Sequence, residues 1–218
     1  MTGSNSGTPV SYPALLSDVR LWIVLLVTAA GILGNILPPA LPALAAGLNV
    51  GDETVGYVIT AYKLPSVLII PLAAVVAGIY GRRMVLIPSL LLYGAVGTAM
   101  FFITSFSLML LFALFLGVGA AAIHPIGVTL LGDFFKGARN SAGQGIRVCV
   151  VGIGAILIPA ATGYVSGVQW SAPFLFFLLT FPILAVVYVF LHEPVERKSS
   201  KRSRDTIFRE YLNVIRDR

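Results

Sequence analysis

The chain has 218 residues, of which 57% are hydrophobic and 11% are charged, and its mean hydropathy is +0.92. A soluble domain carries about 25% charged residues and has no means of covering so much apolar surface, so the composition excludes an ordinary soluble protein. The net charge of +6 does not indicate a nucleic-acid partner, because more than half of the Lys and Arg residues lie beyond Glu193 and no basic face remains elsewhere.

Residues 1–19 form a polar tail that we expect to be cytoplasmic. Residues 1–13 are rich in Ser, Gly, Thr and Pro and lack the basic start of a signal peptide, so we expect the first apolar segment to act as an uncleaved anchor. No charge occurs between Arg20 and Asp52, which is more than the roughly 20 residues that a spanning helix needs. We place this first span at 21–45, interrupted at Asn35 and the prolines that follow it.

Five more long apolar segments follow, and we expect them to span the membrane at 55–79, 84–104, 107–131, 141–165 and 172–191. When these six spans cross the membrane in alternating directions, every Lys and Arg outside them lies on the same side of the membrane. By the positive-inside rule that side is cytoplasmic, so both termini are inside. The sequence therefore predicts an all-α membrane protein with a six-helix bundle at 20–192, located in the cell membrane.

The basic segment 193–218 is not a span. Its apolar residues near the end have helical spacing, which fits either a helix on anionic lipids or a cytoplasmic linker helix leading to further spans. We favour the linker, because the helical pattern is still running at Arg218.

The two halves of the bundle show a weak repeat. Pro39 in the first span precedes Lys63 in the second at nearly the same interval as Pro125 in the fourth span precedes Arg147 in the fifth. Consecutive three-helix units have opposite topology, so this pattern predicts a 3+3 inverted repeat, which is a transporter feature. Prolines are also common in membrane helices for other reasons, and that interpretation stays open.

Three short glycine-containing motifs lie in or next to the predicted spans. They are the turn Gly81-Arg82-Arg83 after the second span, Gly117-Val118-Gly119 in the fourth, and Gly154, Pro159 and Gly163 in the fifth.

With these motifs in this order and topology, the chain resembles the N-terminal half of a major facilitator superfamily transporter, a family built of two six-helix halves. The resemblance covers nearly the whole chain. The chain departs from the family pattern at several motif positions: Ala74 and Gly78 before the turn, Ala113 in the fourth span, and Ile158 and Thr162 in the fifth. The acid of the turn motif and the arginine of the fourth span are therefore absent, and the resemblance implies no role for them here.

Three titratable side chains lie inside the spans, namely Lys63, His124 and Arg147. Counting helical rise from the nearest loop puts each within roughly 6 Å of the membrane midplane, where transporter substrates bind. His124 and Arg147 are about equally far from the turn that joins their helices, so we expect them to be neighbours, with the imidazole neutral. Asn35 is a further candidate for the same site.

The predicted spans contain no carboxylate to neutralise Lys63 or Arg147. We therefore hypothesise a cavity that admits an anionic solute. Two alternatives stay open: Arg147 reaches lipid phosphate at the surface, and His124 bonds a carbonyl freed by Pro125.

These features predict a secondary active transporter of a small solute, an anion under the cavity hypothesis, that works by alternating access with a proton or another ion as the coupling partner. The second half is either a C-terminal six-helix unit of the same gene product, which we favour, or a second copy. The alternatives are a drug/proton antiporter of the same family and a non-transporting receptor or assembly subunit. The sequence shows no metal cluster, nucleotide-binding loop or set of convergent acids, so we expect no enzyme activity, cofactor or metal.

Overall fold

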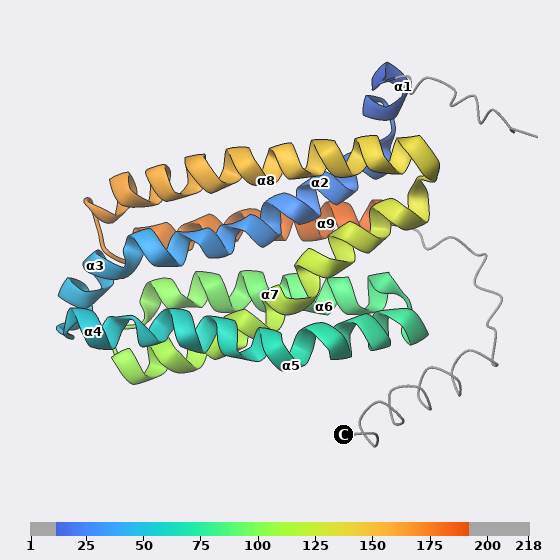
Figure 1. The fold of residues 1–218 in the computed structure, drawn as a ribbon. Coiled ribbons are helices and arrows are strands. Elements are labelled where there is room, and N and C mark those ends of the chain that lie inside the picture. Colours follow the sequence, from blue (N-terminus) through green and yellow to red (C-terminus); the bar gives the residue numbers. More distant parts are fainter. Residues whose placement is uncertain (1–11, 192–218) are drawn as a thin grey trace, which may run out of the picture.

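Helices make up nearly all of residues 12–191, which are the residues that the computed structural model describes, and no strand occurs among them (Figure 1). Six helical stretches in this range are long and apolar enough to cross a membrane: Val19–Leu48, Asp52–Tyr80, Arg82–Phe102, Phe106–Phe134, Gly137–Ser166 and Ala172–Phe190. The prediction of an all-α protein with six spans is therefore confirmed. The predicted linker helix in 193–218 lies outside the described residues.

A short helix, α1 (Tyr12–Leu16), precedes the first span. The span itself is broken near its middle into three parts: α2 (Val19–Ile32), the 3₁₀ segment η1 (Leu33–Ile36) and α3 (Leu37–Leu48). Pro38 and Pro39 have no backbone N–H, so the carbonyls four residues earlier lose their α-helical donors. The carbonyl of Gly34 accepts from the N–H of Leu37 instead, which is the tighter 3₁₀ pattern. The interruption that we predicted at Asn35 is therefore present.

A short helix precedes the second span, and the third span follows it directly: α4 (Asp52–Val55), α5 (Tyr57–Tyr80), α6 (Arg82–Ala99) and the 3₁₀ turn η2 (Met100–Phe102). Gly81 separates α5 from α6 with a φ of 103° and a ψ of 154°. Only glycine adopts this backbone region without strain. The glycine of the turn motif is therefore required by the backbone.

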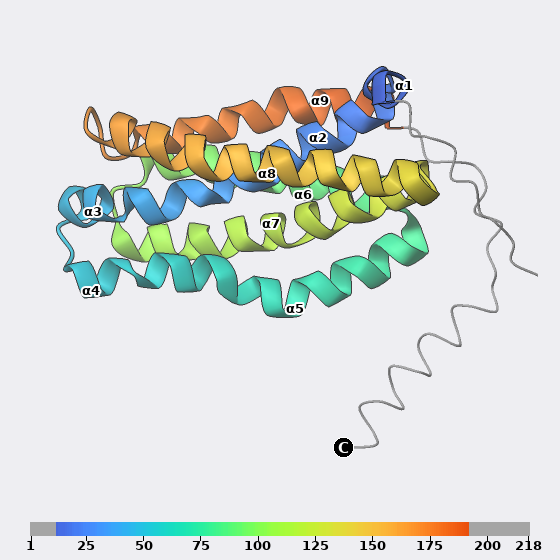
Figure 2. The ribbon, with the colours of Figure 1, turned by 45° about the horizontal axis from the view of Figure 1, so that its top comes forward.

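The remaining spans are the hairpin of α7 (Phe106–Phe134) and α8 (Gly137–Ser166), followed by η3 (Ala172–Leu179) and α9 (Thr180–Phe190). Helix α7 is central, because it packs against α5, α6, α2 and α8. In Figure 1, α8 runs along the upper edge, α2 and α3 slope beneath it, α7 slopes from below α5 at the left up to the end of α8 at the right, and the fainter α6 and α9 lie behind. The turned view in Figure 2 shows α9 rising above α8, as expected for a helix at the back.

The bundle buries its spans unequally. The ring of Tyr93 on α6 packs edge to face against Phe177 in η3, with centroids 5.1 Å apart, and both side chains are fully buried. By contrast, 11% of the most apolar window of Asp52–Tyr80 and 6% of that of Gly137–Ser166 are buried, against 67% in the first span. The apolar outer faces of α5 and α8 therefore require lipid or another protein surface.

Charged contacts join several helix ends at one end of the bundle, which we call the basic end. Arg82 at the start of α6 pairs with Asp133 near the end of α7. Arg139 at the start of α8 lies 3.9 Å from Asp18, the residue that caps α2. These contacts show that the basic loops gather at one end, as the alternating threading predicted. Which side of the membrane this end faces stays a prediction.

Candidate functional site

Arg147 lies well inside the fifth span, on α8. Its Nε donates a hydrogen bond of 3.1 Å to Oε1 of Gln144, one helical turn earlier on the same helix. Its Nη1 is buried and has no hydrogen-bond partner among residues 12–191. No carboxylate in that range pairs with Arg147. The side chain therefore holds a charge without a counter-ion and a buried N–H group without a hydrogen-bond partner in this range.

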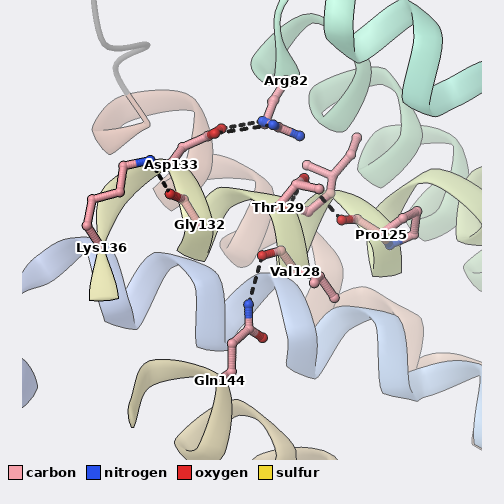
Figure 3. Close-up of polar contacts among 9 residues, drawn as sticks. Arg82, Pro125, Val128, Thr129, Gly132, Asp133, Lys136 and Gln144 are labelled. Carbon is pink, nitrogen blue, oxygen red and sulfur yellow. Dashed lines mark hydrogen bonds and ion pairs between the residues drawn. The ribbon is translucent and has the colours of Figure 1, made fainter. Parts of the chain in front are cut away.

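Gln144 connects Arg147 to the neighbouring helix. Its Nε2 donates a hydrogen bond of 3.0 Å to the carbonyl of Val128 on α7 (Figure 3). The amide thus contacts α7 through its nitrogen and Arg147 through its oxygen. Sequence reasoning does not single out Gln144. The one available signal is a polar amide placed a turn before an arginine in an apolar helix, since residues three apart share a helix face.

His124 is exposed on α7, one helical turn before Val128. His124 lies one turn before Val128 on α7 and Arg147 one turn after Gln144 on α8, so the hydrogen bond between Gln144 and Val128 puts the two residues at the same level of the hairpin. On the side of α2, a Cβ added at Gly31 would lie 3.4 Å from the Nδ1 of His124. The alternative hydrogen bond to a carbonyl freed by Pro125 is absent, because His124 makes no hydrogen bond within the described range. The imidazole nitrogens therefore stay open to a ligand or to water.

The other two predicted site residues do not make polar contact with this pair. Lys63 is exposed on α5, and Asn35 is exposed in η1. Within residues 12–191 neither forms a hydrogen bond or an ion pair. The structure thus brings Arg147 and His124 together with Gln144, and it leaves Lys63 and Asn35 as separate polar groups on other helices.

The turn motif carries an ion pair that the resemblance does not imply, because the acid of the family motif is absent. Arg82 Nε pairs with Asp133 Oδ2, and its Nη2 donates to Oδ1 at 3.2 Å (Figure 3). Next to it, Nη2 of Arg83 donates a hydrogen bond of 2.7 Å to the carbonyl of Tyr188 on α9. The guanidinium of Arg83 also stacks on the ring of Tyr188, with its Cζ 5.2 Å from the ring centroid. The two arginines therefore tie α6 to α7 and α9. In the sequence, Asp133 is visible as a carboxylate on the same side as the arginines, but its partner is not.

Gly117 and Gly119 allow α7 to approach two helices closely. A Cβ added at Gly117 would overlap the backbone oxygen of Tyr62 on α5. One added at Gly119 would lie 3.0 Å from the backbone nitrogen of Tyr93 on α6. Small residues at such crossings let membrane helices pack backbone to backbone. In this chain the motif of the fourth span therefore serves packing.

The residues of the fifth-span motif differ in whether they contact another helix. A Cβ added at Gly154 would lie 2.9 Å from Ile32 on α2, so this glycine is also at a crossing. Pro159 lies inside α8, where it removes one helical hydrogen bond. A Cβ added at Gly163 meets open space. Within the described residues, Gly154 is therefore the glycine of this motif that packing requires.

Comparison with known proteins gives one family and several relatives. The model of the Major Facilitator Superfamily matches residues 23–218. The multidrug transporter protein MdtP of Bacillus subtilis is 26% identical over 157 residues, which are 72% of this chain and 29% of that protein. The bacillibactin exporter of Bacillus subtilis is 31% identical over 150 residues, 65% of this chain and 37% of the exporter. The quinolone resistance protein NorA of Staphylococcus aureus is 26% identical over 166 residues, 74% of this chain and 42% of NorA. The chain thus spans less than half the length of these curated relatives.

Proposed function

The chain belongs to the major facilitator superfamily, and from that premise we propose that it is the N-terminal half of a secondary active transporter that exports a small anionic solute. The family and the relatives are transporters, so the chain is part of a multi-pass membrane transporter and not an enzyme. In the proposal, the described helices form one side of an alternating-access pathway, built as a 3+3 inverted repeat. A second six-helix unit from the same gene product, or a second copy, supplies the other side.

The anionic character of the solute rests on Arg147. Its Nη1 is buried without a partner, and Lys63 has no counter-ion within residues 12–191. An uncompensated cation inside a membrane span is costly, so it is retained where it faces a water-filled path or a ligand. A carboxylate or phosphate group of the solute would neutralise this charge. His124, beside Arg147, would add a neutral hydrogen-bonding group or carry a coupling proton.

The orientation is part of the same proposal. The basic end carries Arg20, Arg82 and Arg139, whereas Asp52 and Glu53 lie in α4 at the far end (Figure 1). The positive-inside rule then puts the basic end in the cytoplasm of a plasma membrane. The direction of transport is proposed as export because the relatives are named as an exporter, a multidrug transporter and a resistance protein.

A drug/proton antiporter is the second candidate. It is favoured by the names of MdtP and NorA, and by the partial motif of Gly154, Pro159 and Gly163 in the fifth span. The two candidates differ in the charge of the solute. Many drug-like solutes are cations, and a cation would be repelled by Arg147 and Lys63.

The test uses the full-length protein that contains this chain, reconstituted in vesicles with an imposed pH gradient. Two labelled probes are compared: benzoate as an anion and tetraphenylphosphonium as a cation. We expect transport of benzoate, with loss of most of that transport in Arg147→Ala and Lys63→Ala. The control is Lys136→Ala, a basic residue at the end of the bundle whose Nζ bonds the carbonyl of Gly132 (Figure 3).

Each result assigns the function. Transport of tetraphenylphosphonium alone would replace the proposal by the drug antiporter. Wild-type benzoate transport in both variants would remove Arg147 and Lys63 from the site. Transport of neither probe at normal expression would favour a receptor or an assembly subunit.

A further inference from the structure

Gln144 determines how the guanidinium of Arg147 is presented. The amide oxygen accepts from Arg147 Nε at 3.1 Å, while the amide nitrogen is anchored on the carbonyl of Val128 at 3.0 Å. An arginine in a membrane helix otherwise has many rotamers and extends toward the nearest surface. Held at both ends of its amide, Gln144 keeps Arg147 at the seam between α7 and α8, beside His124.

The geometry leaves one edge of the guanidinium unused. A guanidinium carries five N–H donors, and Gln144 occupies the single donor on Nε. Nη1 and Nη2 carry the other four donors, and one N–H from each of them lies along the Nη1–Nη2 edge. Nη1 is buried, yet no partner satisfies it within the described residues. Two parallel N–H groups of this kind match the two oxygens of a carboxylate or phosphate group.

The neutrality of Gln144 is as important as its position. A glutamate at the same place would accept from Nε equally well, but it would cancel the charge of Arg147 and lose the donor to Val128. An amide orients the cation and leaves its positive charge available. A salt-bridged arginine attracts anions weakly, whereas the amide of Gln144 leaves the charge of Arg147 free to act on a ligand.

We propose that Gln144 is the positioning residue of an oxyanion-binding site whose binding edge is the Nη1–Nη2 edge of Arg147. The ligand is a carboxylate or phosphate group, either of a free solute or of a lipid headgroup that enters between α7 and α8. This inference rests on the proposed function only in assigning the site to the transported solute; the binding itself is tested separately.

The test is ligand-induced thermal stabilisation of the purified full-length protein in uncharged detergent. The probes are sodium benzoate and sodium phosphate, each compared with sodium chloride at equal ionic strength. We expect the wild type to be stabilised by at least one of the two oxyanions. A parallel series in micelles with phosphatidylglycerol distinguishes a lipid headgroup from a free solute.

Two variants of Gln144 separate positioning from packing. Gln144→Leu removes both hydrogen bonds, and we expect the half-effective oxyanion concentration to rise about tenfold, the size of one lost hydrogen bond to a charged group. Gln144→Glu also loses the bond to Val128 but neutralises Arg147, so we expect a larger rise or complete loss of stabilisation. Arg147→Gln should abolish the response. The matched control is Gln169→Leu, whose amide bonds Ser171 in the loop before η3.

A purely structural Gln144 predicts a different pattern. Both variants would then lose similar stability without ligand and would keep the same oxyanion response, and that result overturns the proposal. No stabilisation by benzoate, phosphate or phosphatidylglycerol also overturns it. Stabilisation by phosphatidylglycerol alone, with the same order of variants, supports the site and identifies lipid as the source.

The transport experiment and the binding experiment can give results that contradict one proposal and leave the other standing. If benzoate transport depends on Arg147 but both Gln144 variants behave as the wild type, the proposed function stands and this inference is wrong. If oxyanions stabilise the protein in the expected order of variants but benzoate is not transported, the site stands and the proposed function is wrong.

Discussion

Arg82 at the start of α6 and Asp133 near the end of α7 form a two-point ion pair between segments that are 51 residues apart. The contact ties the turn between the second and third spans to the end of the fourth. The side chains are 22% and 39% exposed, so water screens the pair in part. The pair thus holds α6 against α7 at the basic end of the bundle.

We expect Arg82→Ala and Asp133→Ala each to lower the free energy of unfolding by about 1 kcal/mol, because a partly exposed ion pair contributes little more. The exchange variant, with Asp at 82 and Arg at 133, should recover part of the loss. The measurement is chemical unfolding of the purified protein in detergent, arranged as a double-mutant cycle. A coupling of zero between the two positions would show that the pair contributes nothing to stability and would contradict this prediction.

Gly117→Ala tests the contact between α7 and α5. An added methyl group would overlap the backbone oxygen of Tyr62, which has no side-chain freedom with which to yield. We expect a loss of about 1–3 kcal/mol in the free energy of unfolding, the usual cost of overpacking. Gly163→Ala is the control, since its methyl group meets open space. Equal stability of the two variants would contradict the packing.

Gly34→Ala tests the break in the first span. Its methyl group would overlap the phenol oxygen of Tyr62 and would lie 3.3 Å from that of Tyr93. We expect a loss of about 1–3 kcal/mol, as for other overpacked sites. Tyr62→Phe removes the overlapping oxygen, so the double variant should be more stable than the sum of the single changes. Thermal unfolding of the four proteins measures this, and simple additivity would refute the contact.

Asp18 stabilises the start of α2 in two ways. Its carboxylate accepts from the backbone N–H of Arg20 at 3.0 Å, and it lies 3.9 Å from Arg139 on α8. We expect Asp18→Ala to cost about 1 kcal/mol, the typical value of a helix cap. Asp18→Asn keeps the cap and loses the charge, so it should cost less than half as much. Unfolding in detergent compares them, and an equal cost would assign the effect to the ion pair.

The number of spans and their approximate limits were predictable because the membrane imposes one rule on every segment. Each backbone polar group must be satisfied inside its own helix, so a long apolar run has one solution. The break in the first span was predictable for a related reason, since Pro38 and Pro39 cannot donate to the carbonyls before them. The fifth span begins at Gly137 and not at 141, because the polar residues Arg139, Asn140 and Ser141 continue the helix beyond the apolar run.

The candidate site was predictable only in part. Equal distance from the hairpin turn predicted that His124 and Arg147 lie at the same depth, and the hydrogen bond between Gln144 and Val128, one turn nearer the loop on each helix, agrees with that register. The pairing of Gln144 with Arg147 and with the carbonyl of Val128 was not predictable. A hydrogen bond between helices depends on how each helix is rotated about its axis, and apolar residues all around a helix leave that rotation unspecified.

Composition, hydropathy and the placement of charges were therefore enough to determine that this chain is a six-span membrane protein, and its motifs indicated the family. The tertiary structure decided the partners of individual side chains: Asp133 for Arg82, Gln144 for Arg147, and the backbone of Tyr62 against Gly117. The physical reason is the number of segments on which each effect depends. Burial in lipid acts on each segment independently along the chain, whereas side-chain pairing depends on the rotation, crossing and depth of two helices together.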